Sequence, residues 1–128
     1  MIVDSSAIVA IFFQEPGFEM LIGKLANAGE AGMSAPTLVE CAIVLSARLG
    51  QDARGLLTRL LKEANIVVIP FTETHYETAV SAWVKVGKGR HPAQLNFGDC
   101  MTYATAKLAG LPLLYVGDDF SQTDLLQA

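Results

Sequence analysis

The chain has 128 residues and a mass of 13.7 kDa, with 52% hydrophobic and 17% charged residues, which is typical of a single globular domain. The longest apolar run, residues 7–13, is shorter than the roughly 18 residues that span a bilayer, so we exclude a membrane-spanning protein. The formal net charge of −4 argues against a surface coated with basic residues for nonspecific nucleic-acid binding. We expect one domain over residues 1–128. The mean hydropathy of +0.39 indicates that a partner or a second copy, as in a homodimer, covers part of its surface.

The first residues and the cysteines bear on the cellular compartment. Asp4 stands where a secretory signal would carry basic residues, so we expect the protein in the cytoplasm. Cys41 and Cys100 form neither a CxxC pair nor a zinc-binding spacing. We therefore expect both as free thiols in a reducing compartment.

The first part of the chain predicts a short strand and two helices. Residues 1–3 are expected as a buried strand, and the apolar stretch 7–13 has helical character. Apolar residues at spacings of three and four predict an amphipathic helix over residues 18–28. Residues 33–35 fit an edge strand.

The middle of the chain predicts two helices and a second buried strand. Pro36 and Gly50 mark the ends of a helix that carries Glu40. Asp52 is expected to cap the next helix and Asn65 to end it. The β-branched run at residues 66–69 predicts a strand buried on both faces.

The last part of the chain predicts two more helices and a final strand. Thr72 is expected to cap one helix, and a second begins at Gly98 and Asp99 and ends at Gly110. Residues 113–116 are expected as the last buried strand. Strands that alternate with helices and are continuous apolar runs indicate a parallel sheet with helices on both faces, the α/β class.

Five acidic residues occupy positions where such a sheet binds ligands, just beyond the carboxyl ends of its strands. Asp4 follows the first strand, Asp118 and Asp119 follow the last, and Glu40 and Asp99 lie in early helical turns, where the helix dipole favours negative charge. Converging carboxylates repel one another unless a cation neutralises them. Ligation by oxygen alone selects Mg²⁺ or Mn²⁺ over zinc, and such an ion activates water for attack on a phosphoryl group.

The same acids also have a structural interpretation as solvated surface groups and helix caps. Asp4 fits that interpretation least, because a charge at the end of a buried strand is costly without a partner. The Asp118–Asp119 pair fits it best, because Gly-Asp-Asp is common in turns.

Four segments, in this order, resemble the PIN-domain ribonucleases and, more narrowly, the VapC toxins of bacterial toxin–antitoxin pairs. They are the opening IVDSSA (residues 2–7), Val39–Glu40, NFGD (residues 96–99) before an alanine-rich helix, and the closing LLYVGDDF (residues 113–120). The resemblance covers essentially the whole chain. It implies a three-layer α/β/α sandwich with a mainly parallel sheet of four or five strands. It also implies Mg²⁺- or Mn²⁺-dependent endoribonuclease activity that leaves a 5′-phosphate and a 3′-hydroxyl, with inhibition by a cognate VapB-type antitoxin.

Carried over by position, the resemblance makes Asp4, Glu40 and Asp99 the metal-site acids and Ser6 the residue that supports Asp4 by hydrogen bonding. The family often places a fourth acid three residues before the final Phe, and Gly117 stands there. Asp118 or Asp119 would then supply the fourth carboxylate. The subgroup ending G-x-D-F-x-x-T-D, matched by residues 117–124, favours Asp119 and leaves Asp118 in a supporting role.

A basic loop and two apolar stripes complete the candidate binding surfaces. Lys88, Arg90 and His91 lie shortly before Asp99, and we expect them to contact RNA phosphates; the alternative is a merely solvated connection. The stripes at residues 18–25 and 56–61 are expected in the core. Their functional alternative is a groove for an antitoxin segment.

Other classes fit less well. A receiver-type signalling domain would carry paired acids early and a Lys after the last strand. A haloacid-dehalogenase-type phosphatase would carry an Asp where Ser6 stands, and no GxGxxG or P-loop motif is present for a nucleotide. The remaining alternative is a PIN-like binding or regulatory protein without nuclease activity, against which the presence of Asp4, Glu40 and Asp99 argues.

Overall fold

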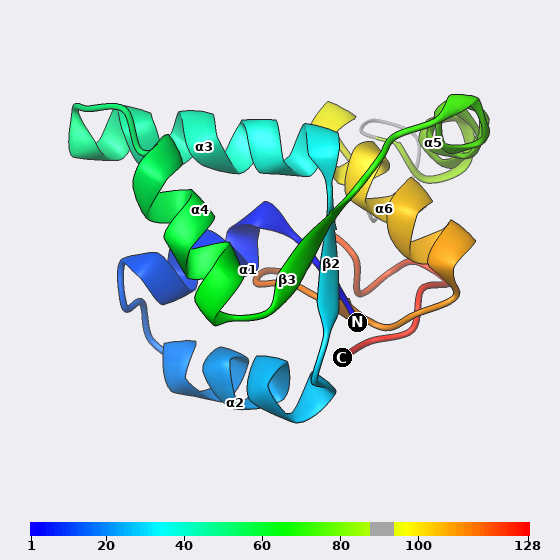
Figure 1. The fold of residues 1–128 in the computed structure, drawn as a ribbon. Coiled ribbons are helices and arrows are strands. Elements are labelled where there is room, and N and C mark those ends of the chain that lie inside the picture. The colour runs from blue at the N-terminus through cyan, green and yellow to red at the C-terminus, as the bar shows by residue number, and fades with distance from the viewer. Residues whose placement is uncertain (88–93) are drawn as a thin grey trace.

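A computed structural model describes residues 1–87 and 94–128 (Figure 1). In this part the elements are, in chain order, β1 (Ile2–Val3), α1 (Ser5–Phe12), α2 (Phe18–Ala28), β2 (Ala31–Ser34), α3 (Ala35–Leu49), α4 (Arg54–Glu63), β3 (Ile66–Ile69), α5 (Glu73–Val86), α6 (Phe97–Ala109) and β4 (Leu113–Leu114). None of these helices is both long and apolar enough to cross a membrane.

The strands form one parallel sheet in the order β3-β2-β1-β4, which confirms the predicted α/β class. Ile2 of β1 pairs with Gly32 of β2 on one side and with Leu113 of β4 on the other. Because β1 lies between β2 and β4, the carboxyl ends of strands far apart in the sequence meet at one edge of the sheet.

Two strand predictions were wrong. Residues 66–69 were expected to be buried on both faces, but β3 lies at the sheet edge, and Val67 and Val68 are 45% and 47% exposed. Residues 33–35 were expected as an edge strand, but β2 spans 31–34 and is an interior strand. The sheet position of a strand depends on its partners, which local composition does not specify.

Helices cover both faces of the sheet, as the sandwich prediction requires. In Figure 1, α1, α2 and α4 lie on one side of the strands and α5 and α6 on the other, with α3 along one end. Val3 and Leu114 belong to the core shared with α1–α4. Ile2 and Leu113 belong to the core shared with α5 and α6. Neighbouring residues of a strand point to opposite faces, so two short strands contribute to both cores.

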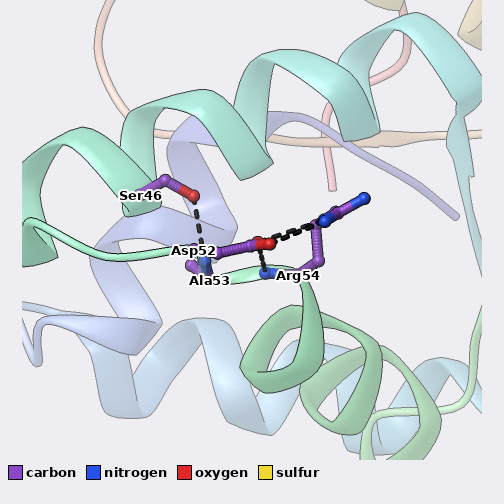
Figure 2. A network of polar contacts seen from close by, with 4 residues as sticks. All are labelled: Ser46, Asp52, Ala53 and Arg54. Carbon is purple, nitrogen blue, oxygen red and sulfur yellow. Dashed lines mark hydrogen bonds and ion pairs between the residues drawn. The ribbon is translucent and has the colours of Figure 1, made fainter.

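Helix ends follow the predicted signals with one clear exception. Gly50 and Gly110 end α3 and α6 with φ of +69° and +65°, a conformation that glycine adopts without strain. Asp52 does not cap α4, because the N-cap is Ala53 (Figure 2). The Ala53 N–H donates to Ser46 Oγ at 2.9 Å, and Asp52 accepts the Arg54 N–H and pairs with its guanidinium. A side chain of α3 thus fixes the start of α4.

Candidate active site

Asp4 lies at the end of β1, where it is the N-cap of α1 and only 5% exposed. Its Oδ2 accepts the Ser6 N–H at 3.1 Å and the Ser6 hydroxyl at 2.6 Å. Its Oδ1 accepts the Thr102 hydroxyl at 2.8 Å. The Ser6 hydroxyl also accepts the Val116 N–H at 3.0 Å, which ties the segment after β4 to the first acid. The buried charge therefore has three donors, which offset the cost of removing it from water.

Asp99 lies in the first turn of α6 and is 9% exposed. Asn96 is the N-cap, and the two residues exchange hydrogen bonds, with the Asn96 N–H to Asp99 Oδ2 at 3.1 Å and the Asp99 N–H to Asn96 Oδ1 at 2.9 Å. Burial raises the pKa of Asp99 to about 7, the Asn96 N–H opposes the rise, and Asp119 and Asp4 add to it. Negative charge is therefore in excess around this carboxyl group.

Glu40 reaches the same region from the second turn of α3 and is half-buried. Its Oε1 accepts the Ser5 hydroxyl at 2.7 Å. Its Oε2 lies directly against Gly98, where a Cβ atom would overlap it. Glycine at position 98 therefore lets the carboxylate of α3 approach the first turn of α6, beside Asp99.

The two acids that follow β4 act on different residues. Asp119 is exposed and lies close enough to Asp99 to raise the pKa of that carboxyl group. The charge of Asp118 acts instead on Tyr115, whose pKa it raises together with burial. Phe120 is buried and packs edge-on against Tyr115 at 5.2 Å between ring centres, which anchors this turn. The structure thus brings Asp119, and not Asp118, to Asp99.

Asp4, Glu40, Asp99 and Asp119 are therefore neighbours, contributed by four separate segments. They do not form a complete metal site in this arrangement. Within residues 1–87 and 94–128, no three His, Cys, Asp or Glu side chains are grouped closely enough to hold one ion. Glu40 is held by Ser5 and Asp99 by Asn96, and repulsion between carboxylates favours such separation when no cation is included. Three further predicted residues, Lys88, Arg90 and His91, lie outside the described residues.

Sequence reasoning missed the hydroxyl groups beneath these acids. The Thr102 hydroxyl that donates to Asp4 lies 2.9 Å from the Thr37 hydroxyl, which lies 2.7 Å from the Ser34 hydroxyl. All three residues are at most 2% exposed. The available signal was a threonine one helical turn after Asp99 in an otherwise alanine-rich helix.

The fold and the acidic centre define the class of protein, and comparison with known sequences agrees. The family described as "PIN domain" matches residues 1–126. Ribonuclease VapC36 of Mycobacterium tuberculosis is 52% identical over 126 residues, which cover 98% of this chain and 91% of that protein. Ribonuclease VapC of Mycolicibacterium smegmatis is 39% identical over 125 residues, with 98% and 97% covered. The chain therefore belongs to the PIN-domain family and, within it, to the VapC ribonucleases.

Solved structures support the fold. The crystal structure of M. tuberculosis VapC20, titled a Sarcin-Ricin loop cleaving toxin, aligns with a TM-score of 0.76 at 19% identity and covers 99% of this chain and 97% of its own. A toxin-antitoxin complex from Klebsiella pneumoniae contains a chain with a TM-score of 0.71 at 18% identity, covering 99% and 95%. At these identities the likeness concerns the α/β architecture alone.

Proposed function

We propose that the chain is the toxin of a type II toxin–antitoxin pair, an endoribonuclease that hydrolyses RNA phosphodiester bonds with Mg²⁺ or Mn²⁺ and is inhibited by a VapB-type antitoxin. One domain, residues 1–128, carries this activity in the cytoplasm. The observation that carries the proposal is the convergence of Asp4, Glu40, Asp99 and Asp119 at the carboxyl edge of the sheet, which concentrates negative charge around Asp99. The names of the relatives, ribonuclease VapC36 and ribonuclease VapC, support RNA as the substrate.

The donor chemistry at the acidic centre fits a hard divalent cation. The donors are carboxylate oxygens, and the two nearby thiols do not compete, because burial and the charges of Asp4 and Glu40 raise the pKa of Cys41 to about 12, and burial and Asp99 raise that of Cys100 to about 11. Asp4, Asp99 and Glu40 would hold the ion, and Asp119 would support it. When bound, Mg²⁺ or Mn²⁺ supplies a Lewis acid that polarises a phosphoryl group and favours deprotonation of water.

The protein residues have distinct tasks in such a centre. Asp4 is fixed by Ser6 and Thr102, so it contributes an oriented carboxylate that need not reorganise when the cation arrives. Burial, Asp119 and Asp4 raise the pKa of Asp99 to about 7, so a bound cation would compete with a proton for this carboxylate near neutral pH. Asp119 is exposed, so it faces the side from which RNA and water approach, and its carboxylate can orient a water molecule by accepting a hydrogen bond.

The described residues on either side of the basic segment lie close to the start of α6. Residues 88–93 lie between Gly87 and Gln94, and the Leu95 N–H donates to Val86 O at 3.0 Å, so both ends of the segment are held together next to the start of α6. We propose that Lys88, Arg90 and His91 contact phosphates. Replacing Lys88 and Arg90 with Ala should weaken RNA binding and reduce its salt dependence by about two counterions. An unchanged salt slope would contradict this role.

For the antitoxin we propose the groove between α1, α2 and α4. It has a volume of about 500 Å³ and is lined by Ile11, Ile22, Leu25, Ala26, Gly29, Leu60, Glu63, Ala64 and Asn65. Ile22 is 44% exposed, whereas Leu21, its neighbour on the predicted stripe, is buried in the core. The stripe therefore contributes side chains both to the core and to the wall of the groove. A short apolar helix or segment fits this surface.

We also propose a homodimer. The observation that supports it is the set of apolar side chains exposed along α5 and at the start of α6, with Tyr76, Val80, Val84 and Phe97 between 49% and 80% exposed. Patches of this kind on a small protein mark interaction sites. Sedimentation of the wild type and of Val80→Lys tests the dimer: loss of association in the variant supports this surface, and a monomeric wild type refutes the dimer.

The nuclease is tested by cleavage of a structured RNA with the purified protein in Mg²⁺, in Mn²⁺ and in EDTA. Asp4→Asn and Asp99→Asn should lose metal-dependent cleavage, whereas Asp118→Asn, at an acid whose charge acts on Tyr115, should retain it. Equal activity in all four proteins would reveal a contaminating ribonuclease and refute the assigned site. Mn²⁺ binding without cleavage of any RNA offered would favour the PIN-like binding protein.

A further inference from the structure

A chain of buried hydroxyl groups runs beneath the acidic centre. It consists of Ser34 at the end of β2, Thr37 in the first turn of α3 and Thr102 in α6, and is called the hydroxyl chain below. It ends on Asp4 Oδ1, at 2.8 Å from Thr102 Oγ1. Polar groups this deeply buried are costly unless each is paired, so their arrangement is specified by the fold.

The acceptor at the end of the hydroxyl chain fixes the direction of every proton in it. An ionised carboxylate can only accept, so Thr102 donates to Asp4 and must accept from Thr37. Thr37 then accepts from Ser34, whose oxygen accepts the Thr37 N–H at 3.2 Å. Every hydroxyl in the hydroxyl chain has a donor and an acceptor partner, and all point their protons toward Asp4.

The hydroxyl chain also connects the elements that carry the other acids. Thr102 lies one helical turn after Asp99 in α6, and Thr37 lies one turn before Glu40 in α3. Residues three apart share a helix face. The hydrogen bond of 2.9 Å between the two threonines therefore fixes α3 against α6 directly below the acids.

We propose that Thr102 is a positioning residue for the divalent cation: through the hydroxyl chain it orients the Asp4 carboxylate and sets the spacing of the acid-bearing helices. The inference rests on the proposed function, because it assumes that Asp4 binds a cation. Ser6 donates to Oδ2, so without Thr102 the Oδ1 atom of Asp4 loses the donor that residues 1–87 and 94–128 supply to it. Groups that orient a metal ligand in this way are commonly worth about 10- to 100-fold in metal affinity.

The test is calorimetric titration with Mn²⁺, which reads binding without RNA cleavage. Thr102→Val keeps the side-chain shape and removes the donor, and it should weaken Mn²⁺ binding by about 10- to 100-fold. Thr102→Ser restores the donor and should return the affinity to within about threefold of the wild type. Thr37→Val keeps the Thr102 hydroxyl as a donor to Asp4 but removes the hydroxyl that donates to Thr102. The loss of Mn²⁺ affinity in Thr37→Val should therefore be smaller, under about tenfold.

A matched control lies one turn further along α6. Thr105 is equally buried, and its hydroxyl donates to Met101 O of its own helix at 3.1 Å and not to an acid of the site. Thr105→Val should therefore leave Mn²⁺ affinity unchanged, even if both valine variants melt at lower temperature. Equal affinity of Thr102→Val and the wild type, equal weakening in Thr105→Val, or no recovery in Thr102→Ser would each overturn the inference.

Asp4→Asn separates the inference from the function on which it rests. If Asp4→Asn loses Mn²⁺ binding while Thr102→Val does not, only the positioning role fails. If Asp4→Asn binds Mn²⁺ like the wild type, the cation does not use Asp4, and both the proposed site and the role of Thr102 are refuted.

Discussion

The raised pKa of Asp99 predicts an unusual pH dependence of stability for the cation-free protein. The folded state retains the Asp99 proton up to a pKa of about 7, whereas the unfolded chain releases it near the ordinary value of 3.8. Between these values the folded state binds more protons, so the free energy of unfolding falls as the pH rises. At about 1.4 kcal/mol for each pKa unit, the full loss is about 4 kcal/mol, of which about 3 kcal/mol falls between pH 5 and pH 8.

Urea unfolding in EDTA at several pH values between 5 and 8 measures this effect. The Asn side chain of Asp99→Asn cannot ionise, but its oxygen can still accept the Asn96 N–H. The free energy of unfolding of this variant should therefore change by about 3 kcal/mol less between pH 5 and pH 8 than that of the wild type. Asp119→Asn should reduce the slope in part, because Asp119 contributes to the raised pKa of Asp99. Asp118→Asn serves as the control and should follow the wild type.

Cation binding should stabilise the folded protein most at pH values at which Asp99 has lost its proton. Saturating Mn²⁺ is therefore expected to stabilise the wild type more at pH 8 than at pH 5, because the cation competes with the Asp99 proton. The reasoning is refuted if the wild type is equally stable at pH 5 and pH 8 in EDTA, or if Asp99→Asn shows the same slope as the wild type.

Three further changes separate stability from activity. Gly98→Ala should displace the flexible Glu40 carboxylate and lower RNA cleavage at least tenfold, while the better helix propensity of Ala keeps the melting temperature unchanged or higher; intact cleavage would refute the close approach. Ile22→Glu should abolish copurification with the antitoxin, whereas Ile43→Glu, at a more exposed isoleucine outside the groove, should not. Asp124→Ala breaks an exposed ion pair with α6 and should cost under about 1 kcal/mol of unfolding free energy in urea; a larger cost would mean that the C-terminal segment depends on it.

The fold class was predictable because its signals are local. Gly50 and Gly110 end their helices with positive φ, as glycine at such positions indicates, and Thr72 is the N-cap of α5 as predicted. The order of strands was not predictable in this way. The β-branched run at residues 66–69 gives the same sequence pattern whether the strand pairs on one side or on both. In the structure it pairs on one side, and Val67 and Val68 are half-exposed at the sheet edge.

The acids of the candidate site could be named from their positions after strands and in early helical turns, together with the family resemblance. Position after the strand did not by itself separate Asp118 from Asp119, because the choice depends on the turn that Gly117 makes with a φ of +102° and on the burial of Phe120. The family resemblance alone favoured Asp119. The hydroxyl chain could not be predicted from the sequence for a related reason. Thr102 is 98 residues from Asp4 and 65 from Thr37, and no local pattern encodes such a contact.

The protein concentrates negative charge where helix dipoles and hydrogen-bond donors can tolerate part of it. Asp4 caps α1 and Asp99 lies in the first turn of α6, so the positive ends of two helices face the centre. These contributions do not fully offset the cost of the buried negative charge. The pKa values of Asp99 and of the Cys41 thiol are raised by burial and further by the surrounding carboxylates. A divalent cation would reverse that penalty and convert the repulsion into binding free energy. The repulsion between carboxylates that lowers the stability of the cation-free protein at high pH is thus the same interaction that favours cation binding. Sites that serve a function commonly reduce stability in this way.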